Sequence, residues 1–150
     1  MTTLEQRIQV LEDIEAIRKL KALYCVACDD NHNPEKLGPL FAEDATWEAT
    51  VLGKAEGREA IKAYLAAVGT SGRIRNSAHH AINPVIDVQG DMATGHWRLI
   101  MLYTENLGTE QVRYQRIIGW YRESYVRTIE GWKFQTLFCQ VEESAPYQLA

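Results

Sequence analysis

The feature that most constrains the fold is an alternating run of residues between positions 92 and 103. One set of alternate positions holds Ala93, Gly95, Trp97, Leu99, Met101 and Tyr103, and the other holds Thr94, His96, Arg98, Ile100 and Leu102. Successive residues of a strand point to opposite faces, so this period of two predicts a β-strand. The preceding Gln89-Gly90-Asp91 is typical of a tight hairpin turn, which would join this strand to another at 79–88.

Two more strands are expected at 112–128 and 132–141, separated by the turn residues Glu130-Gly131. The first part of the chain has a different period. Apolar residues recur three or four positions apart, which predicts an amphipathic helix ending near residue 28. These residues are Ile8, Leu11, Ile14, Ile17, Leu20 and Tyr24. Thr3 with Gln6 resembles a loose capping box that would open the helix.

The segment between these two regions contains shorter elements. Residues 29–34 indicate a turn, and 35–41 a short helix that is interrupted or ends near Gly38-Pro39. A strand is expected at 45–52, a turn between Gly53 and Gly57, a helix at 58–68 and a polar loop at 69–76. Helices followed by long antiparallel strands predict a single α+β domain over 1–150, with helices on one face of the sheet.

The composition narrows the class of partner. The chain has a net charge of −4 and no block of basic residues, which argues against nucleic acid and against a polybasic membrane anchor. No apolar run approaches the roughly 20 residues of a membrane span, and the N-terminus lacks a signal-peptide core. We therefore expect a cytoplasmic protein with a small-molecule ligand. Cys25, Cys28 and Cys139 are expected to be reduced core thiols, since the CxxC lies late in a helical pattern.

A series of local motifs occurs in a characteristic order. They are Ala16-Ile17 with Leu20, Tyr24 and Asp29, then Leu40–Ala45 with Trp47, Gly57–Ile61, His79 with Asn83, Gly90-Asp91 with Ala93, Gly119 with Tyr121, and Gly131–Phe134. This order resembles the nuclear transport factor 2-like superfamily, and within it the SnoaL-like group, over about residues 5 to 141. That group includes polyketide cyclases, scytalone dehydratase, bile acid 7α-dehydratase and hexachlorocyclohexane dehydrochlorinase.

The resemblance implies a cystatin-like, cone-shaped roll in which a curved antiparallel sheet packs on N-terminal helices around an apolar cavity. It implies a cofactor-independent lyase of the dehydratase type, or a ketosteroid-isomerase-like isomerase. Neither an organic cofactor nor a metal is expected. The substrate would be a small hydrophobic molecule containing a ring, such as a polyketide, steroid or terpenoid. A homodimer or homotrimer is expected, as is usual among the relatives.

The resemblance also implies an acid–base pair of Asp29, late in the first helix, with His79 at the start of a strand. A carboxylate on one imidazole nitrogen fixes the tautomer and raises the basicity of the other nitrogen. Helix geometry puts Asp29 about 140° from the apolar stripe at Tyr24, so it would reach the cavity only if the helix unwinds near Cys28. Asp30 and His80 remain alternatives, and a purely structural histidine remains possible.

Tyr24, on the apolar stripe, is the candidate donor that polarises a carbonyl or leaving oxygen, with a core aromatic as the alternative. Asn83 or Gln140 would orient a polar group of the substrate. The expected apolar lining, for which plain core packing is the alternative, consists of Trp47, Trp97, Met101, Tyr103, Trp120, Tyr121 and Phe138. His32 is expected to be exposed, and His96 and Arg98 are expected to face solvent or a subunit interface.

Two departures from the relatives are visible. The slot for a second acidic residue falls near Met101, and residues 137–140 contain no counterpart of the arginine that some relatives carry on the last strand. An anionic substrate would therefore lack its obvious counter-ion. A second function class stays open, namely a non-catalytic binder of apolar ligands or an assembly protein with the same fold. An Asp–His pair inside the cavity would favour catalysis over binding. Metal-dependent hydrolysis is disfavoured, since no spaced trio of histidine and acidic ligands is present.

Overall fold

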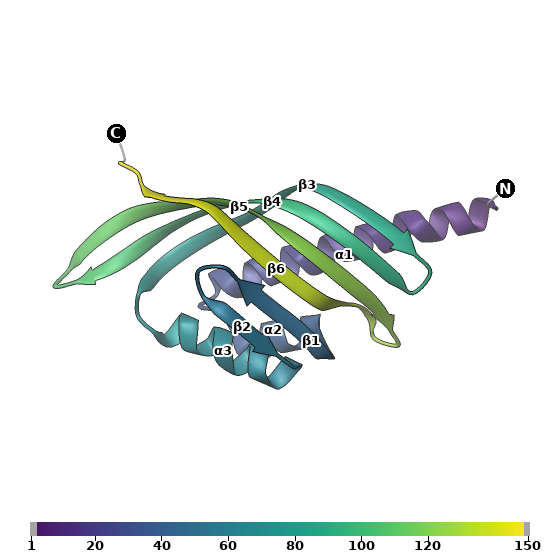
Figure 1. The fold of residues 1–150 in the computed structure, drawn as a ribbon, viewed down its shortest axis with the longest axis horizontal. Coiled ribbons are helices and arrows are strands. Elements are labelled where there is room, and N and C mark those ends of the chain that lie inside the picture. Colours follow the sequence, from purple (N-terminus) through teal and green to yellow (C-terminus); the bar gives the residue numbers. More distant parts are fainter. Residues whose placement is uncertain (1–2, 149–150) are drawn as a thin grey trace.

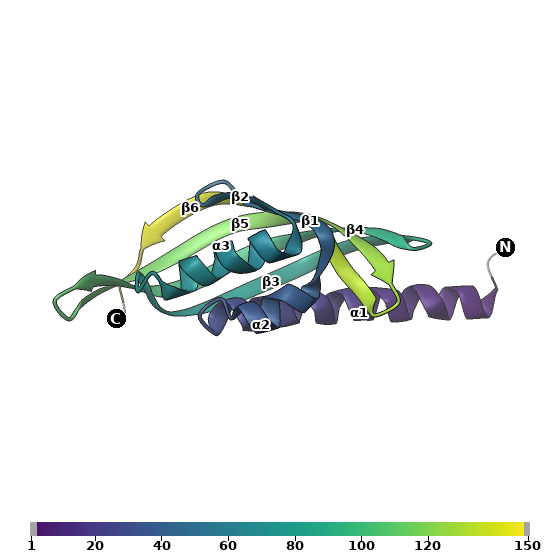
Figure 2. The same ribbon diagram turned by 90° about the horizontal axis from the view of Figure 1, so that it is seen from below.

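The computed structural model describes residues 3–148 of the chain. The elements follow in the order α1 (Leu4–Asp29), α2 (Pro34–Leu37), the 3-10 helix η1 (Gly38–Leu40), β1 (Phe41–Ala49), β2 (Gly53–Glu56), α3 (Arg58–Thr70), β3 (Ile74–Gln89), β4 (Met92–Gly108), β5 (Gln111–Thr128) and β6 (Gly131–Pro146). The six strands form one curved, unclosed sheet in the order β2-β1-β6-β5-β4-β3. The three α-helices lie on one side of this sheet (Figures 1 and 2).

The expected α+β class is confirmed, with corrections to the strands. The sheet is antiparallel except where β1 runs parallel to β6. The segment expected as a turn after Gly53 is the edge strand β2, whose residues pair with 46–49 of β1. The polar loop was expected to extend to residue 76 and the next strand to begin at 79, but β3 begins at Ile74 and pairs with β4. Polar composition was misleading here because the backbone of β4 supplies hydrogen-bond partners regardless of side chain.

Helix α1 begins as the sequence predicts, but Ile8 and Leu11 of the expected apolar stripe are exposed. Thr3 and Gln6 form the expected capping box. Residues 3–12 are exposed, and this N-terminal part of the helix extends beyond the sheet (Figure 2). The buried side chains begin at Asp13 and recur along one face up to Cys28. Within residues 3–148, no helix is long and apolar enough to cross a membrane.

The core under α1 contains a buried ion pair. Lys21 and Glu123 are 1% and 2% exposed, and the Lys21 ammonium lies 2.5 Å from a carboxylate oxygen of Glu123. The Tyr125 hydroxyl donates to the same carboxylate, and Trp97 donates to the Tyr125 oxygen at 3.0 Å. The ammonium also lies 3.2 Å from the centre of the Tyr121 ring, a cation–π contact. The charges are therefore satisfied inside the fold and tie α1 to β5.

A second buried carboxylate fixes the middle of α1 to the far end of the sheet. Asp13 is 4% exposed and accepts two hydrogen bonds from the Arg127 guanidinium, at 2.7 and 2.6 Å. The indole of Trp132 donates to the same group at 3.0 Å. The hydrogen bond from Arg127 is the main reason that the pKa of Asp13 is lowered, against the opposing effect of burial. All three cysteines are buried and free, as expected.

Removing one member of the ion pair between Lys21 and Glu123 should be strongly destabilising. Lys21→Ala leaves the Glu123 carboxylate buried and unpaired, so the free energy of unfolding should fall by about 3–5 kcal/mol in urea denaturation. The double variant Lys21→Met/Glu123→Gln should recover most of this loss, because no buried charge remains. The exposed pair Arg98 and Glu142 is the control, and Arg98→Ala should lower the free energy by less than about 1 kcal/mol. A small effect of Lys21→Ala would contradict the assignment.

Candidate active site

The site is built where α1 ends. Asp29 is the last residue of the helix, Asp30 caps it, and the next two residues adopt the left-handed conformation, with φ of 52° at both Asn31 and His32. The amide of His32 donates to the carbonyl of Cys28 at 3.1 Å, which satisfies one of the free carbonyls of the last turn. The chain therefore reverses sharply, so that Asp29 and His32 both lie at the end of the helix.

The carboxylate of Asp29 binds to the strand β3. The ring nitrogen Nδ1 of His79 lies 2.6 Å from Asp29 Oδ1, and the His79 backbone N–H donates to both carboxylate oxygens at 3.2 and 3.0 Å. The Ser77 hydroxyl donates to Oδ1 at 2.8 Å. The structure thus brings together the two residues of the expected pair, and α1 does not unwind before Asp29.

Charge and hydrogen bonding at this pair favour an ionised carboxylate. Burial alone would raise the pKa of Asp29, but the hydrogen bonds from His79 and Ser77 outweigh it and hold the pKa below its usual value. An ionised carboxylate on Nδ1 favours the tautomer in which Nδ1 carries the proton and Nε2 carries a lone pair. The alternatives lie elsewhere: His80 is exposed, and Asp30 pairs with Lys36 at 2.8 Å.

Next to His79 the structure contains a cavity of about 660 Å³, a size typical of small-molecule sites. Most of the wall surface is apolar, and the polar groups on it come from His32, Tyr64, Ser71, Arg73, His79, Tyr103 and Ser144. The lining residues are His32, Val51, Leu52, Tyr64, Ala67, Val68, Ser71, Arg73, Ile74, His79, Met101, Tyr103, Ile117, Val141 and Ser144. Of the residues expected to line it, Met101 and Tyr103 do so.

Several expected lining residues are core residues instead. Trp97 and Tyr121 share the inner face of the sheet with Met101, but they lie in the packed region under α1. Trp47 is 3% exposed and packs against Tyr64, which itself lines the cavity. Strand alternation identified the correct face of the sheet, but it could not show which part of that face is covered and which part is hollow.

Trp120, Phe138 and Gln140 lie on the opposite face of the sheet. Trp120 is the register partner of Gln140, and it stacks on His96 at 5.6 Å between ring centres. Phe138 packs against Trp120 on the same face. His96 is exposed there, as expected. Asn83 is exposed with φ of 52° where the register of β3 shifts, so it serves a β-bulge and does not line the cavity.

Tyr24 is a core residue in this structure. It is 4% exposed, it accepts a hydrogen bond from the Trp47 indole at 2.9 Å, and it is not among the residues that line the cavity. Its ring packs edge-on against Phe41 and Phe134. Burial raises its pKa well above the usual value. Tyr24 is therefore placed as a core aromatic residue, which was the alternative interpretation. A donor to a carbonyl or leaving oxygen in the cavity would have to be another residue.

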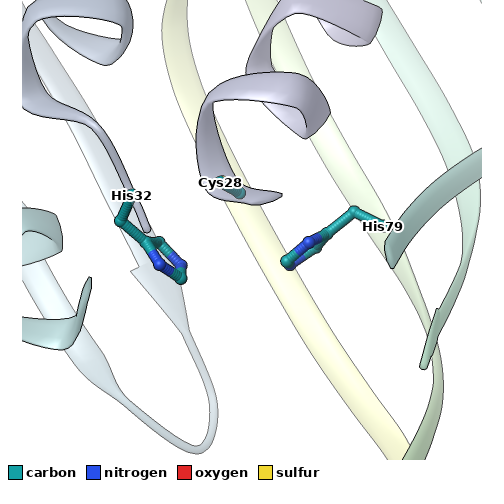
Figure 3. A group of neighbouring side chains, drawn as sticks. All are labelled: Cys28, His32 and His79. Atoms are coloured by element: carbon teal, nitrogen blue, oxygen red, sulfur yellow. The ribbon is translucent and has the colours of Figure 1, made fainter. Parts of the chain in front are cut away.

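The prediction for His32 was wrong, because this residue is buried. It is 7% exposed and lines the cavity beside His79, with the two rings edge to face and their centres 6.2 Å apart. Figure 3 shows the two imidazoles facing the space between them. Burial lowers the pKa of His32 to about 4, the charge of His79 acts in the same direction, and Asp29 opposes it. His32 is therefore a neutral imidazole at neutral pH.

The sequence contains one signal for this burial, although it is visible only afterwards. Gly69 of α3 approaches the turn so closely that a Cβ there would overlap the carbonyl oxygen of Asn31 and contact His32. Gly69 directly follows the helix expected at 58–68 and lies within α3 in the structure. A glycine inside a helix can mark the close approach of another segment. The remaining missed residues come from α3 and the loop after it, among them Tyr64, Ser71 and Arg73, and from β3, β5, β6 and the turn between β1 and β2. Arg73 is cationic, but it is paired with Glu105 at 3.1 Å.

One group of side chains beside the cavity has the residue types of a metal site, namely Cys28, His32 and His79. One potential ligand atom from each lies within 4.8 Å of the others, and thiolate and imidazole groups are common zinc ligands (Figure 3). A thiol must lose its proton to bind zinc, however, and burial raises the pKa of Cys28 far above its usual value. The chemistry of this set therefore fits a metal poorly, and we assign none.

The fold is that of a nuclear transport factor 2-like protein, and it contains a cavity beside His79. The family model of the SnoaL-like domain matches residues 9–137, so the chain belongs to the SnoaL-like family. A comparison with curated protein sequences found no significant match.

Solved structures with the same fold include proteins that are named as a dehydratase or a dehydrochlorinase. A protein provisionally named scytalone dehydratase from Novosphingobium aromaticivorans is 27% identical, with a TM-score of 0.79 over 93% of this chain and 91% of that chain. LinA is 19% identical, with a TM-score of 0.85 over 96% and 95% of the two chains. The LinA-type3 hexachlorocyclohexane dehydrochlorinase from Novosphingobium barchaimii is 21% identical, with a TM-score of 0.81 over 96% of each chain.

Gly69→Ala should displace the turn that carries His32, although residue 69 is distant from this turn in the sequence. In an ordinary helix this substitution stabilises by about 1 kcal/mol. Here the added methyl group overlaps backbone at Asn31, so the turn that carries His32 must move, and we expect a loss of about 1–3 kcal/mol in thermal or urea unfolding. An unchanged or higher stability would show that the turn is free to shift.

The buried His32 should make stability depend on pH. Its pKa is about 4 in the folded chain and 6.5 when unfolded, so between these values the unfolded chain binds more protons. Its contribution is complete above pH 6.5 and is lost as the pH falls towards 4, by about 3 kcal/mol in all. His32→Asn should remove this component from urea denaturation at pH 7 and pH 4.5, whereas His80→Asn should keep it. Identical slopes in the wild type and His32→Asn would contradict the burial.

Proposed function

We propose that the protein is a cofactor-independent lyase of the dehydratase type, or an isomerase, that acts on a small hydrophobic molecule containing a ring. The observation that carries this proposal is the hydrogen bond of 2.6 Å between His79 Nδ1 and Asp29 beside an apolar cavity. The family supports a lyase-like role at a general level, and the neighbouring dehydratase and dehydrochlorinase structures belong to the same fold.

In this proposal His79 is the general base. Asp29 holds the proton on Nδ1 and stabilises the imidazolium that forms when Nε2 takes a proton from the substrate. The electron pair of the broken C–H bond forms a double bond, and either a leaving group departs or the proton returns at another carbon. The Asp29 side chain is partly exposed and does not line the cavity, so it would stabilise the imidazolium through the direct hydrogen bond of 2.6 Å to Nδ1.

The anchoring of Asp29 also supports this role. Because the carboxylate accepts bonds from Ser77 and from the His79 backbone as well as from the ring, it cannot rotate away when the ring becomes charged. A base held in one orientation in the free protein needs little rearrangement during the reaction. Asp29 is then a positioning residue and His79 the catalytic residue.

Substitution of the base should separate catalysis from folding. Cyclic β-hydroxy ketones would be screened for a new conjugated double bond by ultraviolet absorbance. His79→Ala should lower kcat by about 10²–10⁴-fold, because proton transfer loses its positioned base. Asp29→Asn should lower kcat as well, since an amide cannot stabilise the imidazolium.

His80→Ala is the matched control, because it removes a neighbouring imidazole that is exposed and should leave kcat unchanged. Equal rates for His79→Ala and the wild type would contradict the proposal. If ring compounds raise the melting temperature equally in the wild type and His79→Ala and none is converted, the protein is instead a binder of apolar ligands.

A further inference from the structure

His32 is a buried polar group for which the protein provides no partner. It is 7% exposed, and within residues 3–148 its ring makes no hydrogen bond to the protein. The nearby ring of His79, whose centre lies 6.2 Å away, is bonded to Asp29. Over the same residues, every side-chain nitrogen or oxygen that is fully shielded has a partner. The ring nitrogens of His32 are therefore not fully shielded, and the residue lines the cavity. Buried polar groups are normally hydrogen-bonded, so an occupant of the cavity is expected to complete this one.

The imidazoles of His32 and His79 lie close to each other beside the cavity. A ring nitrogen of His32 and one of His79 lie within 4.8 Å of each other, and the pair makes no direct hydrogen bond. An oxygen atom that makes hydrogen bonds of about 2.8 Å to two groups at a tetrahedral angle joins atoms about 4.6 Å apart. The two imidazoles are therefore close enough for one oxygen atom of a ligand to contact both. Figure 3 shows the rings on either side of the gap between them.

The two rings also have complementary hydrogen-bonding roles. Asp29 occupies Nδ1 of His79, so the nitrogen left for a ligand is an acceptor. His32 is neutral at neutral pH and therefore carries one N–H that can donate. A hydroxyl group satisfies both, because it donates to His79 and accepts from His32. A carbonyl oxygen accepts from His32 and leaves the lone pair of His79 free for a proton on the neighbouring carbon, whereas a chlorine substituent is a poor partner for either ring.

We propose that His32 is the hydrogen-bond donor for an oxygen substituent of the ligand, and that the substrate is therefore an oxygenated ring compound rather than a halogenated one. This inference rests on the proposed function in so far as the ligand is called a substrate. Binding of an oxygen substituent by His32 does not itself require catalysis. His32 supplies the donor that Tyr24, buried against Trp47, cannot provide. The walls next to the pair, such as Met101 and Val68, are apolar and would hold the ring itself.

Two probes of equal ring size test the oxygen site without turnover, namely 2-naphthol and 2-chloronaphthalene. In the wild type, 2-naphthol should bind about tenfold more tightly, as measured by its fluorescence, with 2-chloronaphthalene measured by competition. His32→Phe keeps an aromatic ring but removes the donor, and this preference should fall to about twofold or less. His80→Phe is the matched control and should keep the full preference, because His80 is exposed.

A measurement on the wild type guards against misfolding of His32→Phe. With ¹⁵N-labelled histidine, 2-naphthol should shift the ring nitrogen signals of His32 in the nuclear magnetic resonance spectrum, and 2-chloronaphthalene should leave them in place. Equal affinities of the two probes in the wild type, an unchanged preference in His32→Phe, or unmoved His32 signals would each overturn the proposal.

The outcomes for the oxygen site and for catalysis remain distinguishable. If the naphthol preference depends on His32 but no ring compound is converted, the oxygen site stands and the proposed lyase or isomerase activity fails. If His79→Ala abolishes conversion while the preference is independent of His32, the proposed function stands and the role of His32 is overturned.

Discussion

Both the fold near the cavity and the site depend on the hydrogen bonds that join the Asp29 carboxylate to His79 and Ser77. The position of Asp29 at the C-terminus of α1 is locally unfavourable, because the helix dipole places negative charge there and the last turn contains no basic residue. The bonds from the backbone and ring of His79 and from Ser77 offset this. Since hydrogen bonds to charged groups contribute about 1.5–3 kcal/mol each, Asp29 docks α1 onto the edge strand β3 and orients the imidazole at the same time.

Much of the fold followed from the sequence, because local periodicity and turn chemistry act within a few residues. The helix with its Thr3 cap and the hairpin between β3 and β4 are examples. Contact between Asp29 and His79 was implied by the resemblance, whereas helix geometry alone argued against it unless α1 unwound. That argument assumed that only the apolar stripe at Tyr24 faces other elements. Strand β3 in fact passes along a second flank of the helix and meets Asp29 there.

The cavity could not be derived in the same way. Trp97 and Met101 share one face of β4, yet one is in the packed core and the other lines the cavity. The difference depends on how α1 and α3 cover the sheet, which alternation along a strand does not encode. His32 was missed for a similar reason: a polar turn is normally exposed, and its burial results from the close approach of Gly69, distant in sequence.

The packed and hollow parts of the inner face differ in how their polar groups are satisfied. Under α1, Lys21 and Glu123 satisfy each other, and Tyr125 completes the set. Beside the cavity, Asp29 is fully bonded, but His32 and the second nitrogen of His79 have capacity left for a ligand. Apolar walls discriminate weakly between ligands of similar shape, whereas a site that hydrogen-bonds an oxygen rejects analogues without it far more strongly. On the proposed function, selection among ring compounds would rest with the two imidazoles, and the apolar residues around them would contribute affinity.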